Sequence, residues 1–266
     1  MISPRELLIY FAHKYQGDWA NILNAIKRKE QFNTQEVRKL IDNLHYKCLT
    51  IFDPEYPEHL KNTYRVPLCL FYYGDISILT NQMLKLAVVG SRECSESAKN
   101  ITEELVKGVC SDYVIVSGMA EGVDSIAHLA AINNGGKTIA ILGTGIDYCY
   151  PSTNIYLYKE LKEKHLVISE YPGSISYIQD GFPNRNRIIS GLSHGVLITE
   201  AKMGSGTMIT ASFAINMGRD VMCVPDSPIS QSYCNRLIKD GAYLVEVPED
   251  VKNVMENKKI LVKNLK

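Results

Sequence analysis

The feature that most constrains the fold of this 266-residue chain is an alternation of short apolar runs with longer, helix-compatible segments, which begins near Leu84. Each apolar run is continuous rather than alternating, as in parallel strands that are covered on both faces. The alternation predicts strand–helix–strand units in a doubly wound, mostly parallel α/β sheet. The expected strands are 86–89, 114–116, 138–142, 167–169, 196–199, 221–224 and 243–245, after an earlier strand within 67–75. The expected helices lie at about 95–109, 123–133, 154–164, 187–192, 207–217 and 231–239.

The first part of the chain has a different pattern. From Ser3 to about Leu49 the apolar residues recur at helical spacing, and Ser3-Pro4-Arg5-Glu6 has the cap, proline and acid of a helix start. This predicts a small all-α module of about three helices. The composition changes near Arg65, so we expect a helical N-terminal domain over residues 1–65 and the α/β domain over 66–266.

The turns that follow the expected strands are rich in glycine and hydroxyl residues. Four of the five turns combine the two, and they include Gly90-Ser91-Arg92, Ser117-Gly118, Gly143-Thr144 and Ser205-Gly206-Thr207. Ligands of doubly wound sheets bind at this edge, where glycine permits close backbone approach and hydroxyls donate to phosphate or sugar. Arg92 would add a planar cation, beside a helix N-terminus. The turns favour a groove for a phosphorylated ligand, although tight turns need glycine anyway and Ser or Thr also cap helices.

Specific nucleotide fingerprints are incomplete. The turn at Gly143-Thr144-Gly145 lacks a third glycine, because Tyr148 occupies that position. The turn from Gly204 to Thr207 has no P-loop lysine. Binding of NAD or ATP in the usual way is therefore disfavoured, and we expect no cofactor.

A second notable stretch, Phe182-Pro183-Asn184-Arg185-Asn186-Arg187, precedes an apolar helix. A base could stack on Phe182 while Arg185 or Arg187 holds the backbone, as in single-strand binders. Alternatively, Phe182 belongs to the core, Asn184 caps the helix, and one arginine pairs with Glu170 or Glu200. Both alternatives stay open for each arginine.

Asp124 and His128 are the best candidates for catalysis, since they lie one helical turn apart near the expected groove. Such a pair could be a general base and its orienter. More often it is a contact that anchors a helix. We therefore expect a protein that is not an enzyme.

The formal net charge is zero, which argues against a protein that coats nucleic acid by bulk electrostatics. Any polyanion site must be local. The seven cysteines and six histidines are scattered without metal-ligand spacing, which favours reduced thiols and no metal site. No apolar run approaches the roughly 20 residues that span a bilayer. We expect a cytoplasmic protein without membrane contact.

Taken in order, these motifs resemble those of the DNA-processing protein A family, also called Smf. The resemblance extends over roughly residues 67–247. The matching stretches are 89–92, 117–124 with His128, 138–151, 169–172, 182–193, 200–201, 205–211 and 224–225.

The resemblance implies an extended Rossmann fold that binds single-stranded DNA, without catalysis or cofactor. It also implies a homodimer that displaces single-strand-binding protein and loads the RecA recombinase onto incoming DNA in natural transformation. Arg92, Ser117, Gly118 and Phe182 match family positions at the DNA site. The N-terminal part looks like the sterile-alpha-motif-like module of some members, and we expect no counterpart of the winged-helix domain of other relatives.

We expect the single-stranded DNA site to comprise Gly90, Ser91, Arg92, Ser117, Gly118, Phe182, Arg185, Asn186, Arg187, Lys202, Ser205, Gly206 and Thr207. Lys202 is included because family members often carry a basic residue shortly before the aromatic, where this chain has Gln179 and Asp180. The alternative function is a Rossmann-like nucleotide-processing enzyme similar to the lysine-decarboxylase-like phosphoribohydrolases, whose glycine-rich turn is only partly matched at Gly204 to Met208. A third possible function is that of a purely protein-binding module.

Overall fold

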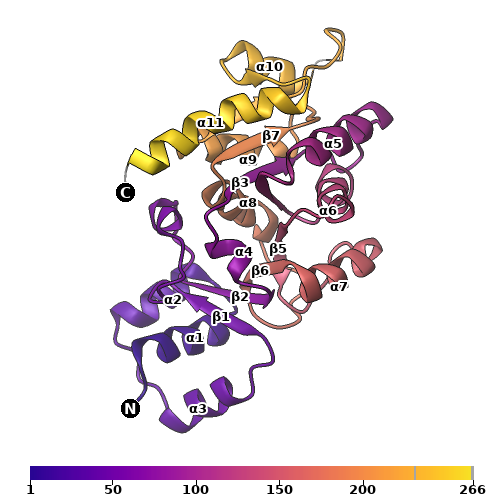
Figure 1. Cartoon of the computed structure of the whole chain (residues 1–266). Coiled ribbons are helices and arrows are strands. Elements are labelled where there is room, and N and C mark those ends of the chain that lie inside the picture. The colour runs from indigo at the N-terminus through magenta and orange to yellow at the C-terminus, as the bar shows by residue number, and fades with distance from the viewer. Residues whose placement is uncertain (231, 265–266) are drawn as a thin grey trace.

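The computed structural model describes residues 1–230 and 232–264, with side chains described up to residue 256. In this part of the chain, one nine-stranded sheet carries helices on both faces (Figure 1). The strands are β1 (Lys47–Thr50), β2 (Cys69–Gly74), β3 (Leu84–Val89), β4 (Tyr113–Ser117), β5 (Thr138–Gly145), β6 (Leu166–Tyr171), β7 (Gly195–Ile198), β8 (Asp220–Cys223) and β9 (Tyr243–Leu244). The α-helices are α1 (Pro4–Lys14), α2 (Trp19–Lys27), α3 (Thr34–Asp42), α4 (Ser77–Thr80), α5 (Glu96–Val109), α6 (Val123–Asn133), α7 (Ile155–Lys164), α8 (Gly181–Leu192), α9 (Gly206–Asn216), α10 (Tyr233–Lys239) and α11 (Pro248–Asn264). Two short 3₁₀ helices are η1 (Glu58–Asn62) and η2 (Ser152–Asn154).

The strand order confirms the predicted doubly wound, mostly parallel sheet. The order is β1-β2-β6-β5-β4-β3-β7-β8-β9, and only the pairs β1–β2 and β2–β6 are antiparallel among those described. From β3 the chain proceeds outward through β4, β5 and β6, and then returns to β7 on the other side of β3. The connections that leave the carboxyl ends of β3 and β7 therefore diverge, which opens a crevice at this edge.

The central strands are buried on both faces, as their continuous apolar runs predicted. In β3, Ala87 and Val89 belong to the cluster that packs under α8 and α9. Leu86 and Val88 belong to the cluster that packs under α5, α6 and α11. Burial on both faces explains why β3 reads as an uninterrupted apolar segment.

The N-terminal helices form as predicted and pack against the sheet. Ser3 and Glu6 form a capping box that starts α1. Leu8 and Phe11 of α1 share one apolar cluster with Phe71 of β2. In Figure 1 these helices lie at one end of the molecule and α11 at the other.

Strand β1 was not predicted, and it lies inside residues 1–65. It pairs with β2 in the same sheet, so this stretch is not wholly helical. Only four residues long and at the sheet edge, β1 is partly exposed and gives a weak apolar signal. A domain boundary near Arg65 stays a prediction.

Three helices differ from the sequence-based expectation. Helix α8 begins at Gly181 rather than near Arg187, so the Phe182–Arg187 stretch lies within the helix and not ahead of it. Pro183 is compatible with this, since proline is tolerated in the first turn. Asn184 is therefore not the cap, a position that Asp180 occupies. Helices α4 and α11 were not predicted.

Candidate functional site

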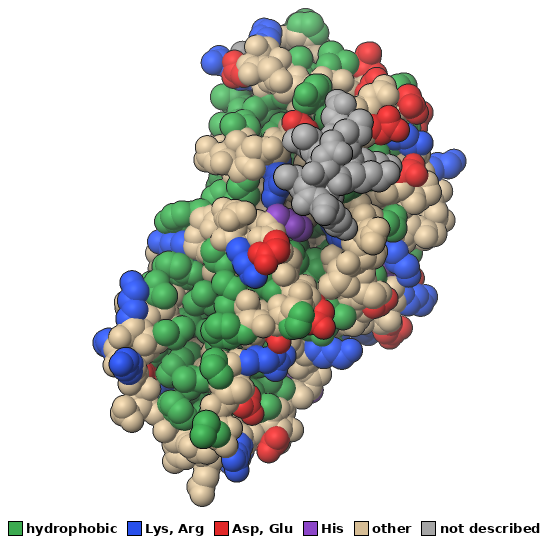
Figure 2. Space-filling model, turned by 60° about the vertical axis from the view of Figure 1, so that its left-hand side comes forward, with side chains coloured by type: hydrophobic (Ala, Val, Ile, Leu, Met, Phe, Trp, Pro, Cys, Tyr) green, Lys and Arg blue, Asp and Glu red, His purple; other side chains and the backbone are tan. Residues whose placement is uncertain are grey.

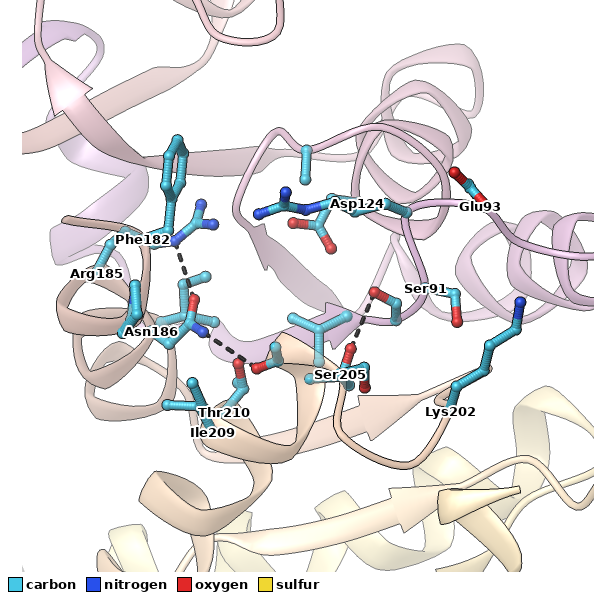
Figure 3. Close-up of a pocket in the computed structure, with 18 residues that line it drawn as sticks. Ser91, Glu93, Asp124, Phe182, Arg185, Asn186, Lys202, Ser205, Ile209 and Thr210 are labelled. Atoms are coloured by element: carbon cyan, nitrogen blue, oxygen red, sulfur yellow. Dashed lines mark hydrogen bonds between the residues drawn. The ribbon is translucent and has the colours of Figure 1, made fainter. Parts of the chain in front are cut away.

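A groove with a cavity of about 460 Å³ lies at the carboxyl ends of β3 and β7, between the first turns of α8 and α9 (Figure 3). Its lining residues are Val89, Gly90, Ser91, Arg92, Glu93, Ala120, Asp124, Phe182, Pro183, Arg185, Asn186, Ile189, Lys202, Ser205, Gly206, Thr207, Ile209 and Thr210. The structure thus brings together most of the residues expected at the site. Ser117, Gly118 and Arg187 lie elsewhere.

The turn after β3 is held by its neighbours. The Ser91 amide donates to the Glu200 carbonyl at 2.9 Å, and the Thr207 hydroxyl donates to the Gly90 carbonyl at 3.0 Å. A Cβ on Gly90 would lie 2.6 Å from the Val123 side chain, so glycine is needed here for packing. The expected helix N-terminus is displaced, because α5 starts only at Glu96. The turn therefore presents the Arg92 side chain to a ligand, rather than the amides of a helix end.

Arg92 and Phe182 meet at the groove. The guanidinium carbon of Arg92 lies 5.6 Å from the centroid of the Phe182 ring, within the range of a cation–π contact. Phe182 projects from the first turn of α8 and is partly exposed. The ring of Tyr150 lies 5.2 Å from that of Phe182, at an interplanar angle of 49°. An exposed cation and two aromatic rings are thus adjacent at this edge.

Arg185 lies at the base of the groove, almost fully buried. Its Nη1 donates to the carbonyls of Gly118 and Ile141, and its Nε donates to the Asn186 amide oxygen at 3.1 Å. Burial lowers the pKa of Arg185 to about 10, and the charge of Asp124 opposes that change. Because its donors are engaged by backbone carbonyls, Arg185 serves to hold the turn after β4.

Asp124 faces this arginine and is also buried. Its carboxylate accepts from the Gly118 amide at 3.1 Å. Burial raises the pKa of Asp124, and Arg185 opposes the increase. The floor of the groove therefore holds two buried groups of opposite charge, each hydrogen-bonded to the backbone of Gly118.

Ser117 and Gly118 support the groove from beneath instead of lining it, which corrects the expectation. The Ser117 hydroxyl is fully buried and donates to the Val88 carbonyl at 2.6 Å. A Cβ on Gly118 would lie 1.9 Å from Nη1 of Arg185. The residue is thus glycine because the arginine occupies that space.

Arg187 was also expected at the groove, and this was wrong. Its side chain is 2% exposed, and its Nη2 donates to both carboxylate oxygens of Glu170 at 2.6 and 2.8 Å. Two residues apart on α8, Arg185 and Arg187 point to different sides of the helix. The alternative in which one arginine pairs with Glu170 is correct for Arg187.

The candidate catalytic pair does not act as a unit. Asp124 bonds the Gly118 amide, whereas Nδ1 of His128 lies 2.6 Å from the Thr138 hydroxyl. His128 is completely buried, and burial lowers its pKa to about 3. The geometry is that of an anchored helix rather than of a base and its orienter.

Several groove residues were missed from the sequence. Pro183, Ile209 and Thr210 line it because α8 and α9 begin side by side there. Only the exact helix starts would have revealed them. Tyr150, whose ring packs against Phe182, was also missed.

Charges of both signs are interspersed on the face that Figure 2 presents. Within residues 1–230 and 232–264, no cluster of His, Cys, Asp and Glu could hold a metal ion. The helices described there are also too short or too polar to cross a bilayer.

Comparisons with known proteins identify the chain's relatives. The model of a family described as DNA recombination-mediator protein A matches residues 47–256. A DNA processing protein DprA from Streptococcus pneumoniae is 44% identical over 241 residues, which are 88% of this chain and 85% of that protein. A DNA processing protein DprA from Bacillus subtilis is 37% identical, over 76% of this chain and 69% of that protein.

Two solved structures agree with these sequence matches. The structure of DNA processing protein A from Streptococcus pneumoniae superposes with a TM-score of 0.79 at 38% identity, over 93% of this chain and 92% of that one. The structure of DNA processing protein A from Helicobacter pylori superposes with a TM-score of 0.71 at 28% identity, over 81% of this chain and 98% of that one. That structure is described for its unique single-stranded DNA binding mode. The expected resemblance and the Rossmann-like fold are confirmed.

Proposed function

This chain belongs to the DNA recombination-mediator protein A family, and from that premise we propose that it binds single-stranded DNA in the groove between β3 and β7. The observation that carries the proposal is the placement of Arg92 against Phe182 at the groove, 5.6 Å from guanidinium carbon to ring centroid. A cation beside an aromatic ring suits one phosphate and one base of a flexible strand. Ser91 and Ser205 line the same groove, but the Ser91 hydroxyl donates to the Glu200 carbonyl at 3.5 Å and the Ser205 hydroxyl is buried, so the contact with DNA rests on Arg92 and Phe182.

The groove favours single strands over duplex. Phe182 lines a cavity of about 460 Å³. A base can enter this cavity only after it has left the stack of neighbouring bases. In duplex DNA that step costs a few kcal/mol, whereas a single strand offers its bases freely. Stacking on an aromatic ring is worth roughly 1–3 kcal/mol per base and tolerates any sequence.

Few charges are available for phosphate. Arg92 and Lys202 are exposed in the groove, while the charge of Arg185 lies beside Asp124. Two phosphate contacts to a single strand correspond to a salt slope of about −1.4 in log affinity against log salt concentration. Binding is therefore expected to weaken only modestly with salt.

A titration of labelled oligothymidylate against duplex of equal length, followed by fluorescence anisotropy over a salt series, tests this function. We expect tighter binding of the single strand, and a loss of about 1–3 kcal/mol for Arg92→Ala, as for a charge-assisted bond. Arg28→Ala is the matched control, because Arg28 lies at the end of α2 with its side chain 70% exposed. Equal affinity for both DNA forms would contradict the proposal.

We further propose the family's wider role for this chain. It acts by binding rather than by catalysis, as a cytoplasmic homodimer that displaces single-strand-binding protein and loads the RecA recombinase in natural transformation. Membership of the family and the separate partners of Asp124 and His128 support this role. We expect the protein to speed RecA filament formation on DNA coated with single-strand-binding protein. An unchanged rate would count against the loading role alone.

A further inference from the structure

A second pocket, with a cavity of about 300 Å³, lies on the other side of the α8 N-terminus from the groove. Trp19, Arg65 and Tyr177 line it, together with Gln179 and Asn184. We call these five residues and this cavity the aromatic pocket. We propose that the aromatic pocket holds a further nucleobase of the same DNA strand. This inference rests on the proposed function and extends it.

The rings of this pocket are arranged to receive a flat ligand. The Trp19 indole is fixed, because its Nε1 donates to the Val66 carbonyl at 2.9 Å. The guanidinium carbon of Arg65 lies 5.9 Å from the Trp19 ring centroid and 5.3 Å from that of Tyr64. Tyr177 is 77% exposed and contributes a free ring on the opposite loop. A planar base can stack on aromatic rings and on a guanidinium plane.

Buried contacts hold the Arg65 backbone in an unfavourable conformation. Arg65 has φ of +49°, which is uncommon for a residue with a side chain. Nε of Arg187 donates at 3.1 Å to the carbonyls of both Tyr64 and Arg65. Arg187 is itself held by Glu170. It is therefore a positioning residue that fixes Arg65 against α8, and backbone strain of this kind tends to gather at functional sites.

The aromatic pocket and the groove open on one edge of the sheet. Glu170 and Tyr171, which end β6, line the aromatic pocket, while the turns after β3 and β7 line the groove. The first turn of α8 separates them, with Phe182 in the groove and Asn184 in the aromatic pocket. A strand that leaves the groove across this turn therefore reaches the aromatic pocket.

The amides favour a nucleobase over a purely apolar occupant. Gln179 and Asn184 both carry a side-chain amide, and that of Asn184 is hydrogen-bonded to Tyr171, so Gln179 is the amide that can pair with the edge of any base. Tryptophan, tyrosine and arginine also occur at protein interfaces. The shared edge with the groove favours DNA as the occupant, and a protein partner is an outcome that the test below separates.

The only tryptophan of the chain, Trp19, gives this site its own signal. Oligothymidylates of about 4 and about 16 nucleotides, the ends of the usual range of site sizes, are titrated in parallel. Binding is followed by anisotropy of a label on the DNA, and occupancy of the aromatic pocket by Trp19 emission. We expect both oligomers to bind, and only the longer to quench Trp19.

The variants are Arg65→Ala and Tyr177→Ala, and Tyr156→Ala is the matched control because Tyr156 is an 82% exposed tyrosine on α7. Loss of one stacked base should weaken binding of the longer oligomer about tenfold in either variant and leave the shorter unchanged. Wild-type affinity in both variants with unchanged Trp19 emission would overturn the inference, as expected if the pocket serves a protein. If the wild type bound neither oligomer, the proposed function would fail, and the inference with it.

Discussion

Replacement of Arg187 by methionine is the most direct test of the buried ion pair between Arg187 on α8 and Glu170. Methionine keeps the length of the side chain but removes the charge and every donor. Glu170 would then remain buried without its partner, since the two side chains are only 2% and 7% exposed. The carbonyls of Tyr64, Arg65 and Asn184 would also lose a donor.

The expected loss is large. Removing one member of a buried ion pair typically costs about 3–5 kcal/mol, because the other charge is left uncompensated. For a chain of this size each kcal/mol lowers the melting temperature by roughly 2–4 °C, so Arg187→Met should melt about 6–20 °C lower than the wild type. Urea unfolding followed by circular dichroism gives the free energy directly.

The double variant Glu170→Leu, Arg187→Met separates pair loss from packing loss. Without a buried carboxylate, it should be more stable than Arg187→Met alone. In Arg187→Met, burial raises the pKa of Glu170 with no arginine to oppose it. The folded state then binds a proton more readily than the unfolded state, so the deficit should shrink as the pH falls. A loss below about 1 kcal/mol, or additive effects of the two substitutions, would refute this account.

Two further predictions concern other buried groups. Burial lowers the pKa of His59 to about 4 and of His194 to about 3, so between pH 6.5 and about 4 only the unfolded chain takes up their protons. As the pH falls through this window, the free energy of unfolding should therefore decrease by up to about 1.4 kcal/mol per pH unit for each histidine. The variant His194→Asn should reduce this slope, as measured by urea unfolding at several pH values. Gly118→Ala, whose Cβ would meet Arg185 at 1.9 Å, should lower stability by about 1–3 kcal/mol and weaken DNA binding. Gly206→Ala has nothing within 4 Å of its Cβ and should leave the melting temperature unchanged, and equal losses in the two variants would contradict the packing argument.

The sheet could be predicted from the sequence because its central strands are buried on both faces. The segment at 86–89 is a continuous apolar run, and the structure extends it only to Leu84–Val89. The edge strand Lys47–Thr50 escaped prediction because it is short and half exposed, so its residues do not carry that pattern. Local composition therefore identifies the interior of the sheet better than its edges.

Most of the residues expected at the site line the groove, but their roles could not be predicted from the sequence. Arg185 and Arg187 are equivalent in the sequence, and only the start of α8 at Gly181 decides which one faces the groove. The stretch from Phe182 to Arg187 was expected to precede the helix, yet it lies in the first turns of α8. The sequence suggested that Gly118 lets a ligand approach the backbone. In the structure, the space beside Gly118 is filled by the side chain of Arg185 from α8. Such roles depend on contacts between distant segments, which spacing along the chain does not encode.

The central claim is that single-stranded DNA occupies the groove between β3 and β7. Photo-cross-linking of an oligonucleotide that carries 5-iododeoxyuridine, followed by peptide mass spectrometry, tests it most directly, because the base cross-links to the aromatic ring on which it stacks. We expect the main adduct on Phe182 or on Tyr150 beside it. We also expect Arg92→Ala to reduce the yield of that adduct. An adduct confined to the opposite edge of the sheet, at the cavity lined by His59 and His194, would contradict the account.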